Sequence, residues 1–572
     1  MTALAASAPV TARRFGIDMS MPVLLLFAGV LCVLVVLPLA WLGYYAVTDP
    51  KGALTFANLR NLDSADFIGP LLTTFALATL SSLLSCAVAA PMAWLVARSD
   101  MPLKRTVRLL VTASFVTPPF IGAIAWELLA APNSGLLNQL FRDMTGASGS
   151  AHLLNIYSFS GVVFVISCYT FPYVFVLIAN ALDRMPGDLE DASAILGART
   201  WDTARRITIP LALPALVAGA LVAFLDAMTV FGSPAILAMP AGFHTMTTKI
   251  WSLFEFPPKE QLAAAAALPL LFLTIILLRA QNMALGRRTY AVLGAKNSEP
   301  RIVRLGGYKW IALALSLAVL MCPVFLPYFA LLNASFSKLA SHIVSVNNFT
   351  LKNVTFVFNE LSETGLAVWN TFVLGLLAAT IGTILSVVIS YVTVRKAVTG
   401  HRLLGLLATA PIAIPGIVLG VGLFLSYTRP PLVLYGTLWI LLIAYVTLTM
   451  PAAYQQLQSA VQAVHPELED ASRILGATRL RALWQITAPL LRTSVIATWC
   501  FIFVGVIREL SAAIMLFTSQ TKVLSVLIYD LNESGDLAAI AVLGVFMLIV
   551  TSVIVALANT LRFGGRIPAT TR

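Results

Sequence analysis

Four ionisable side chains lie inside long apolar stretches of the sequence: Glu127, Asp226, and the adjacent Arg508 and Glu509. A charge in the core of a bilayer costs about 2.5–3.5 kcal/mol on insertion scales, so such groups usually face a partner or a wet path. Carboxylates would suit a hard cation, whereas Arg508 would suit an anion. A structural ion pair that locks the helices together is the alternative, and the sequence leaves both roles open.

The sequence gives little support for metal binding, thiol chemistry or ATP hydrolysis. The cysteines fall within apolar stretches without C-x-x-C spacing, and the histidines lie outside these stretches or at their edges. No G-x-x-x-x-G-K-[ST] phosphate loop occurs, so the chain is not expected to hydrolyse ATP by that route. We predict no catalytic residue, no metal site and no cofactor, and any driving energy must come from a partner.

One polar stretch occurs twice between apolar spans. Residues 189–211 and 468–490 are identical at 13 of 23 positions, all at an offset of 279. Leucine, alanine and isoleucine recur at helical spacing and form one narrow apolar face. Gly197 and Gly476 stand where a first helix should stop, because glycine adopts a positive φ at little cost. Pro210 and Pro489 then fit the first turn of the next helix.

The order E-D-A, a glycine five residues later and I-x-x-P ten residues beyond resembles the EAA loop of permease subunits of ABC-type importers. In that family the loop is cytoplasmic and docks into a groove on the ATP-binding subunit. The resemblance implies two copies of a separate ATPase, one on each loop. It assigns polar contacts to Glu190, Asp191, Glu469 and Asp470, and close approach to the small residues Ala192, Gly197, Ala471 and Gly476.

Two alternative interpretations of these loops remain open. The acids could simply favour a helix N-terminus, which is worth about 0.3–1 kcal/mol. The loops could also be amphipathic connectors that bind no partner.

Composition places the chain in a membrane. It is 59% hydrophobic and 11% charged, with a mean hydropathy of +0.89, and apolar runs long enough to cross about 30 Å of hydrocarbon recur along it. We predict an all-α integral membrane protein with twelve helices, near 21–47, 70–96, 107–130, 159–182, 212–236, 261–281, 309–333, 366–394, 403–427, 437–459, 492–516 and 538–560.

The twelve spans divide into two parallel repeats of six. The first occupies 1–280 with its loop at 183–211, a polar linker fills 281–308, and the second occupies 309–572 with its loop at 460–490. Early pairs such as Thr74 with Thr371 and Arg98 with Arg395 share an offset of 297. The difference from 279 is assigned to a longer first-half loop near 131–158.

Orientation follows from the basic residues. One set of loops holds 27 of the 37 lysines and arginines and the opposite set holds nine, so the richer side is predicted to be cytoplasmic. It includes both termini, the linker and both repeated loops of a chain placed in the bacterial inner membrane. The net charge of +12 is thereby explained without nucleic acid.

Proline and glycine interrupt the third and ninth spans around Pro119 and Pro415. Such breaks free backbone carbonyls, which membrane depth tolerates only where protein or water covers them. These residues are therefore candidates for a cavity wall, with an ordinary packed kink as the alternative.

The fused form with two EAA loops looks like the permeases of ferric-iron importers and of relatives that carry 2-aminoethylphosphonate. Arg508-Glu509-Leu510-Ser511-Ala512 resembles the ferric branch, whereas the first-half counterpart around Asp226 departs from it. The resemblance implies a periplasmic binding protein as a further partner. Iron(III) is the first expectation for the cargo, phosphonate the second, and a polyamine or another small solute the third. A secondary transporter is the competing class, but it would not need duplicated cytoplasmic loops.

Overall fold

The computed structural model describes residues 20–563 apart from 148, 150, 287–300, 341 and 399. Both chain termini, whose cytoplasmic position the sequence predicts, lie outside these residues. The described part is helical and holds three isolated β-bridges but no β-strand. The prediction of an all-α membrane protein is confirmed, since long apolar helices recur through both halves.

In the described residues of the first half there are fourteen α-helices, and three short π- or 3₁₀-segments lie between some of them. They are α1 Ser20–Leu31, α2 Leu37–Ala46, α3 Ala57–Arg60, α4 Ala65–Arg98, α5 Lys104–Val116, α6 Pro119–Ala130, α7 Leu136–Thr145, α8 Phe159–Asp183, α9 Asp188–Ile195, α10 Thr200–Thr203, α11 Ile209–Thr229, α12 Gly232–Leu237, α13 Met246–Ser252 and α14 Glu260–Gly286. The helix α14 runs past residue 281, where the sequence placed the start of the linker.

The second half repeats most of this order. Its helices are α15 Tyr308–Leu320, α16 Leu326–Phe336, α17 Lys352–Thr355, α18 Ser362–Val394, α19 His401–Thr409, α20 Gly416–Tyr427, α21 Leu438–Ala463, α22 Pro466–Ile474, α23 Arg479–Ala482, α24 Ala488–Arg508, α25 Ala513–Leu516, α26 Leu524–Ser534 and α27 Leu537–Phe563. The short α7 has no counterpart here, as the longer first-half loop led us to expect.

Two predicted spans are sharply broken. Helices α5 and α6 meet at 98°, and the segment His401–Ala413 meets α20 at 110°. Pro118 and Pro415 directly precede α6 and α20 in an extended conformation, because a proline ring clashes with the preceding helical turn. The breaks are too sharp for ordinary kinks.

Each broken pair nevertheless carries the chain across the bundle. Helices α4 and α8 run in the same direction, because Ser81 contacts Val163 and Arg98 contacts Met185. The chain between their ends must return to the opposite end of the bundle, and α5 with α6 makes that return. Ten helices are long and apolar enough to span a membrane, and the first broken pair adds one crossing.

The second half gives the same result. Arg395, which follows α18, donates a hydrogen bond to the carbonyl of Val464 at the end of α21. Helices α18 and α21 therefore also end together, and α19 with α20 makes the return. Counting each broken pair as one span gives the predicted twelve.

The first helices of the two halves are exchanged. Helix α2 packs on α20, where the Tyr427 hydroxyl donates to Val33 O at 3.0 Å, and α16 packs on α6, where Trp126 Nε1 donates to Cys322 O at 3.1 Å. Both acceptors lie in π-turns, Cys32–Val36 and Met321–Phe325, where the helical hydrogen-bond ladder is locally displaced. The exchange ties the repeats together.

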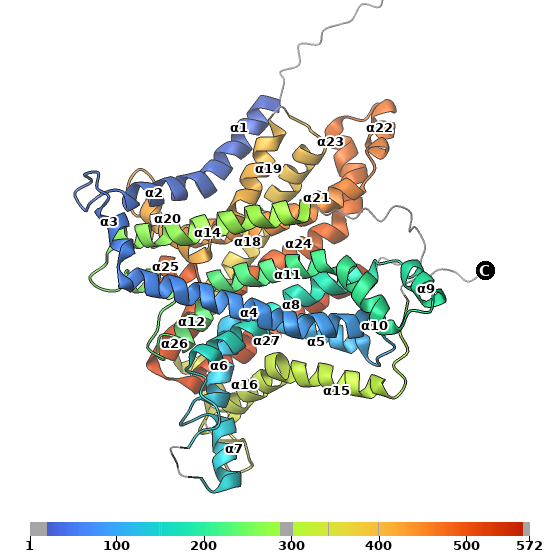
Figure 1. The fold of residues 1–572 in the computed structure, drawn as a ribbon. Helices are drawn as coiled ribbons and strands as arrows, with labels where there is room; N and C mark the ends of the chain where they lie inside the picture. Colours follow the sequence, from blue (N-terminus) through green and yellow to red (C-terminus); the bar gives the residue numbers. More distant parts are fainter. Residues whose placement is uncertain are drawn as a thin grey trace, which may run out of the picture.

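Figure 1 shows how these elements position the two repeated loops. The loop helices α9 with α10 and α22 with α23 project at the right of the view, and α3 lies at the opposite side. The short helices α12, α25 and α26 lie in the left part of the view, nearer to α3 than to the loop helices.

Candidate functional site

The two repeated loops have the same local structure. The first helix of each ends at Ile195 or Ile474, and the glycine two residues later has a φ of +81° at Gly197 and +92° at Gly476. Pro210 and Pro489 occupy the first turn of α11 and α24. The predicted turn geometry is confirmed in both copies, because glycine alone adopts this φ without strain.

The first-loop glutamate faces inward rather than outward. Glu190 is only 5% exposed; its Oε1 accepts a hydrogen bond of 2.7 Å from Thr208, and its Oε2 lies 3.7 Å from Arg98 Nη1. Thr208 ends the π-turn before α11, and Arg98 ends α4. The carboxylate therefore joins the loop to two spans of its own repeat.

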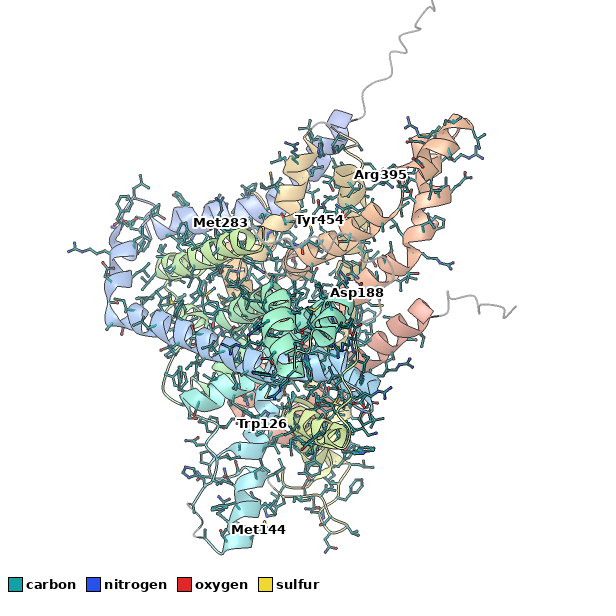
Figure 2. The ribbon with its side chains drawn as sticks, turned by 45° about the vertical axis from the view of Figure 1, so that its right-hand side comes forward. Trp126, Met144, Asp188, Met283, Arg395 and Tyr454 are labelled. Carbon is teal, nitrogen blue, oxygen red and sulfur yellow. The ribbon has the colours of Figure 1, made fainter. Side chains whose placement is uncertain are left out.

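Glu469 makes the same anchor in the second repeat. It is 7% exposed and accepts hydrogen bonds from Tyr391 at 2.9 Å, Arg395 at 3.1 Å and Thr487 at 2.7 Å. Burial raises the pKa of Glu469, but these hydrogen bonds and the Arg395 charge outweigh burial and leave the pKa below its ordinary value. Figure 2 labels Arg395 at the base of the second loop.

These contacts revise the role predicted for the two glutamates. The sequence placed both at the ATPase surface, whereas the structure uses them to hold each loop onto its repeat. The neighbouring Asp191 and Asp470 are exposed; Asp191 lies 3.4 Å from Arg301, and Asp470 lies 3.6 Å from Arg473 in its own helix.

Each repeated loop carries a ridge of exposed apolar side chains, whose importance the sequence did not reveal. Ile195 and Leu196 are 86% and 87% exposed, and their counterparts Ile474 and Leu475 are 86% and 88% exposed. Leu189, Leu468, Trp201 and Trp484 are also exposed beside them. The helical spacing found the apolar face, but only the structure shows that it points away from the bundle.

The predicted small residues lie on the same surfaces. Ala192, Gly197, Ala471 and Gly476 are all exposed, and a β-carbon built on either glycine would meet no atom within 4 Å. Within the chain itself nothing requires them to be small, apart from the positive φ of the glycines.

Asp226 of the fifth span and Arg508 of the eleventh lie near each other across the two repeats. The Asp226 carboxylate faces the Tyr173 hydroxyl, and Arg508 lies close enough to attract it, although the two charges do not form an ion pair within 4 Å. The Arg508 guanidinium also sits 5.5 Å from the centre of the Phe115 ring, a favourable cation–π contact. Asp226 and Arg508 are therefore brought together, although α11 ends at Thr229 and α24 at Arg508, earlier than predicted.

Glu509 lies outside the helix and has a different partner. Its Oε1 accepts a hydrogen bond of 2.7 Å from Ala512 N, and the amides of Leu510 and Ser511 also face the carboxylate. Glu509 and Arg508 are adjacent in sequence, but their side chains have different partners in the structure. Glu127 likewise has its own partners, Tyr157 at 2.7 Å and Asn532 at 3.1 Å.

The proline breaks lie against the segments that follow α11 and α24. Ser233 donates to Pro119 O at 3.0 Å, and a β-carbon built on Gly416, next to Pro415, would lie 3.0 Å from Glu509 Oε1. Pro119, Pro415 and Glu509 are thus drawn to the middle of the bundle.

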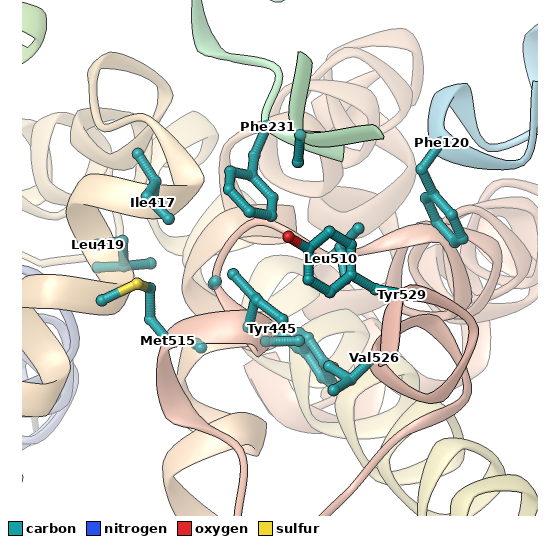
Figure 3. Close-up of a cluster of buried hydrophobic side chains, with 14 of the residues drawn as sticks. Phe120, Phe231, Ile417, Leu419, Tyr445, Leu510, Met515, Val526 and Tyr529 are labelled. Atoms are coloured by element: carbon teal, nitrogen blue, oxygen red, sulfur yellow. The ribbon is translucent and has the colours of Figure 1, made fainter. Parts of the chain in front are cut away.

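An apolar cluster closes this middle region. Phe231 and Leu510 are 0% and 3% exposed, and they lie together among Phe120, Tyr445 and Tyr529 in Figure 3. Leu510 Cδ2 is 3.2 Å from a β-carbon built on Gly232, the residue after Phe231. Sequence reasoning missed this pair, although its separation of 279 residues was a usable signal.

The chain is similar to known proteins over most of its length. The family model for the inner membrane component of binding-protein-dependent transport systems matches residues 88–289 and again 382–562. The chain is 25% identical over 464 residues to the ferric transport system permease protein FbpB of Actinobacillus pleuropneumoniae, covering 79% of this chain and 65% of that protein. It is 26% identical over 419 residues to the putative ferric transport system permease protein FbpB 1 of Haemophilus influenzae, covering 71% and 64%.

A further relative is the putative 2-aminoethylphosphonate transport system permease protein PhnV of Salmonella paratyphi A. It is 27% identical over 141 residues, which cover 25% of this chain and 53% of that protein. The chain spans just under two thirds of the length of the two ferric permeases.

The two family matches contain the two repeated loops, one in each. They also contain the Arg98–Glu190 and Arg395–Glu469 anchors. The chain therefore belongs to the family of binding-protein-dependent transport system inner membrane components, and it carries the family domain twice.

Proposed function

We propose that this chain is the permease subunit of an ABC importer and forms the translocation path through the inner membrane. Two copies of a separate ATPase dock on the two loops at the cytoplasmic face, and a periplasmic binding protein delivers the cargo. The chain itself performs no ATP hydrolysis.

One observation carries the proposal: the same exposed apolar ridge appears twice, each time on a loop that a buried glutamate anchors to its own repeat. An exposed pair of large aliphatic side chains at 86–88% exposure is costly unless a partner covers it. The buried glutamate anchors beneath each ridge link it to α4 and α11, or to α18 and α24. A partner that moves the ridge would therefore move both helices with it.

The apolar cluster at Phe231 and Leu510 supports a path between the halves. These residues follow α11 and α24, the helices that the loops control. Rocking of the two repeats would separate them and open a route beside Asp226 and Arg508.

Iron(III) is the proposed cargo, supported by the names of the two ferric relatives. The alternative is 2-aminoethylphosphonate, supported by the shorter match to a phosphonate permease. A polyamine or another small solute is the third candidate.

Reconstitution with the cognate ATPase tests the docking role. Changing Ile195 and Leu196, or Ile474 and Leu475, to aspartate should weaken ATPase binding about thirtyfold, since a buried interface anchor contributes about 2 kcal/mol. Val346, which is 98% exposed and lies outside the loops, gives the control Val346→Asp. Unchanged ATPase binding in both double variants would reduce the loops to connectors, and cargo uptake without any ATPase would favour a secondary transporter.

Calorimetry on the cognate binding protein tests the cargo. We expect tight binding of iron(III) and no measurable binding of 2-aminoethylphosphonate or spermidine. The reverse pattern would replace iron with the ligand that binds.

A further inference from the structure

The two loop anchors differ at the arginine, which donates a hydrogen bond to Glu469 in the second repeat but lies 3.7 Å from Glu190 in the first, and at one further residue. In the second repeat Tyr391 donates a hydrogen bond to Glu469 at 2.9 Å. At the offset of 297 that relates Arg98 to Arg395, the first-repeat counterpart of Tyr391 is Trp94, whose indole donates nothing to Glu190 among the hydrogen bonds of the described residues. The first anchor therefore lacks one of the contacts that the second possesses.

The chain that leads into the second repeat lies beside this part of the first anchor. Val303 N donates to Arg98 O at 2.8 Å, and Asp100 N donates to Val303 O at 3.1 Å. Leu305 N donates to Asp100 Oδ1 at 2.8 Å. Residues 301–305 are thus pinned along the end of α4, and Trp94, Arg98, Glu190, Arg301 and Val303 line a small pocket there.

Arg301 extends from this segment onto the first loop. Its Nη1 donates a hydrogen bond of 2.6 Å to Glu190 O, and its Nε lies 3.4 Å from Asp191 Oδ1. A guanidinium has donors in a fixed fork, so one side chain can hold a carbonyl and a carboxylate together. Asp470, in contrast, is paired within its own helix by Arg473.

We propose that Arg301 is a positioning residue that fastens the first docking loop to the chain entering the second repeat. The inference rests on the proposed docking function. The segment that holds Arg301 leads into α15, which begins at Tyr308 and packs on α4 and α5 of the first repeat, whereas the anchor of the second loop in the described residues is made within its own repeat. The two ATPase sites are therefore inequivalent, and the linker sets the position of the first.

Hydrogen exchange on the purified permease without its ATPase tests the tie directly. Arg301→Ala should speed amide exchange in residues 187–198 about five- to tenfold and leave 466–477 unchanged, because exchange reports local opening. Tyr391→Phe is the matched variant and should give the opposite pattern. Arg301→Lys should restore only part of the protection, since lysine keeps the charge but lacks the fixed fork that reaches both acceptors. Equal exchange in Arg301→Ala and the wild type would overturn the proposal.

Titration with the ATPase then separates the tie from the docking function. We expect Arg301→Ala to weaken one of two ATPase binding events severalfold and to leave the other at its wild-type value. Equal weakening of both events, or none, would refute the inequivalence. If the exchange result holds but the wild type binds no ATPase, the docking function fails and the tie stands.

Discussion

Phe231 and Leu510 are equivalent residues of the two repeats, 279 positions apart, and they lie together in the buried centre of the molecule (Figure 3). Each follows the last turn of a long helix, α11 or α24, that starts at one of the repeated loops. The residues that close the centre are therefore one helix away from the proposed ATPase contacts.

Replacing both residues of this pair with smaller ones should let cargo leak through the permease. We expect Phe231→Leu with Leu510→Val to raise ATP-independent flux through proteoliposomes several-fold, because smaller side chains leave a gap in a tightly packed closure. Ile417→Val removes one methylene from the same cluster away from the pair and serves as the control. Flux equal to that of the control would place the path elsewhere.

The proximity of Asp226 and Arg508 predicts that their substitution affects stability and transport to different degrees. If the pair is mainly structural, Asp226→Asn or Arg508→Gln should cost about 3–5 kcal/mol, because the remaining charge loses its partner. We expect instead that uptake falls at least tenfold while the melting temperature stays within a few degrees. For iron(III), Asp226→Asn should impair uptake more than Arg508→Gln, and an anionic cargo should reverse that order. A fall in melting temperature that accounts for all the lost uptake would make the pair structural.

The substitution Glu509→Gln should behave differently from those at Asp226 and Arg508. Its carboxylate accepts backbone amides of the turn 509–512 rather than facing Arg508. We therefore expect a loss of thermal stability together with any loss of uptake, in the same measurements.

The loop glycines should resist replacement for a backbone reason. Gly197→Val and Gly476→Val force a β-branched residue to a positive φ, which costs about 1–2 kcal/mol or more. We expect weaker ATPase association with normal membrane insertion. Gly146, at φ +65° in the turn after α7 and with open space around it, gives the control Gly146→Val. Wild-type association in both loop variants would contradict the role of the turn.

The second loop should loosen in acid. The pKa of Glu469 is held below its ordinary value in the folded protein, so its charge contributes stability that is fully present above the unfolded pKa of about 4.3. That stability is lost as the pH falls from there through the folded pKa. Amide exchange in 466–477, corrected for the intrinsic pH effect, should rise at low pH in the wild type, and Glu469→Gln should show the loosened loop already at pH 7. A flat wild-type profile across that window would argue against the anchor.

Orientation is open to a direct test. Reporter fusions in the 281–308 linker should read out on the cytoplasmic side, and fusions in 131–158 or 334–364 on the opposite side, because of the distribution of basic loops. An external signal from the linker would reverse the topology and remove the docking role.

Much of this organisation was predictable because it depends on local pattern. Hydropathy located the long apolar helices, since the length of a span is set by the bilayer. The offsets of 279 and 297 identified the repeats, and both occur because the first half carries the additional α7 region between Arg98 and Glu190, residues that pair as Arg395 and Glu469 do. Glycine and proline fixed the turn and the helix start in each loop.

The direction in which each side chain faces was decided by tertiary structure. Periodicity defines a face but not its surroundings, so Glu190 and Glu469 were placed outward although Thr208, Arg98 and their counterparts bury them. The break angles at Pro118 and Pro415, the exchange of the first helices, and the meeting of Phe231 with Leu510 all depend on contacts between residues distant in sequence. Such contacts leave little local signal, because the same apolar residue packs equally well against a neighbouring helix, a lipid tail or a partner protein. The sequence by itself determined the helices, the repeats and the two loops, whereas the packing of one repeat against the other decided which surfaces remain free to bind and which close the centre.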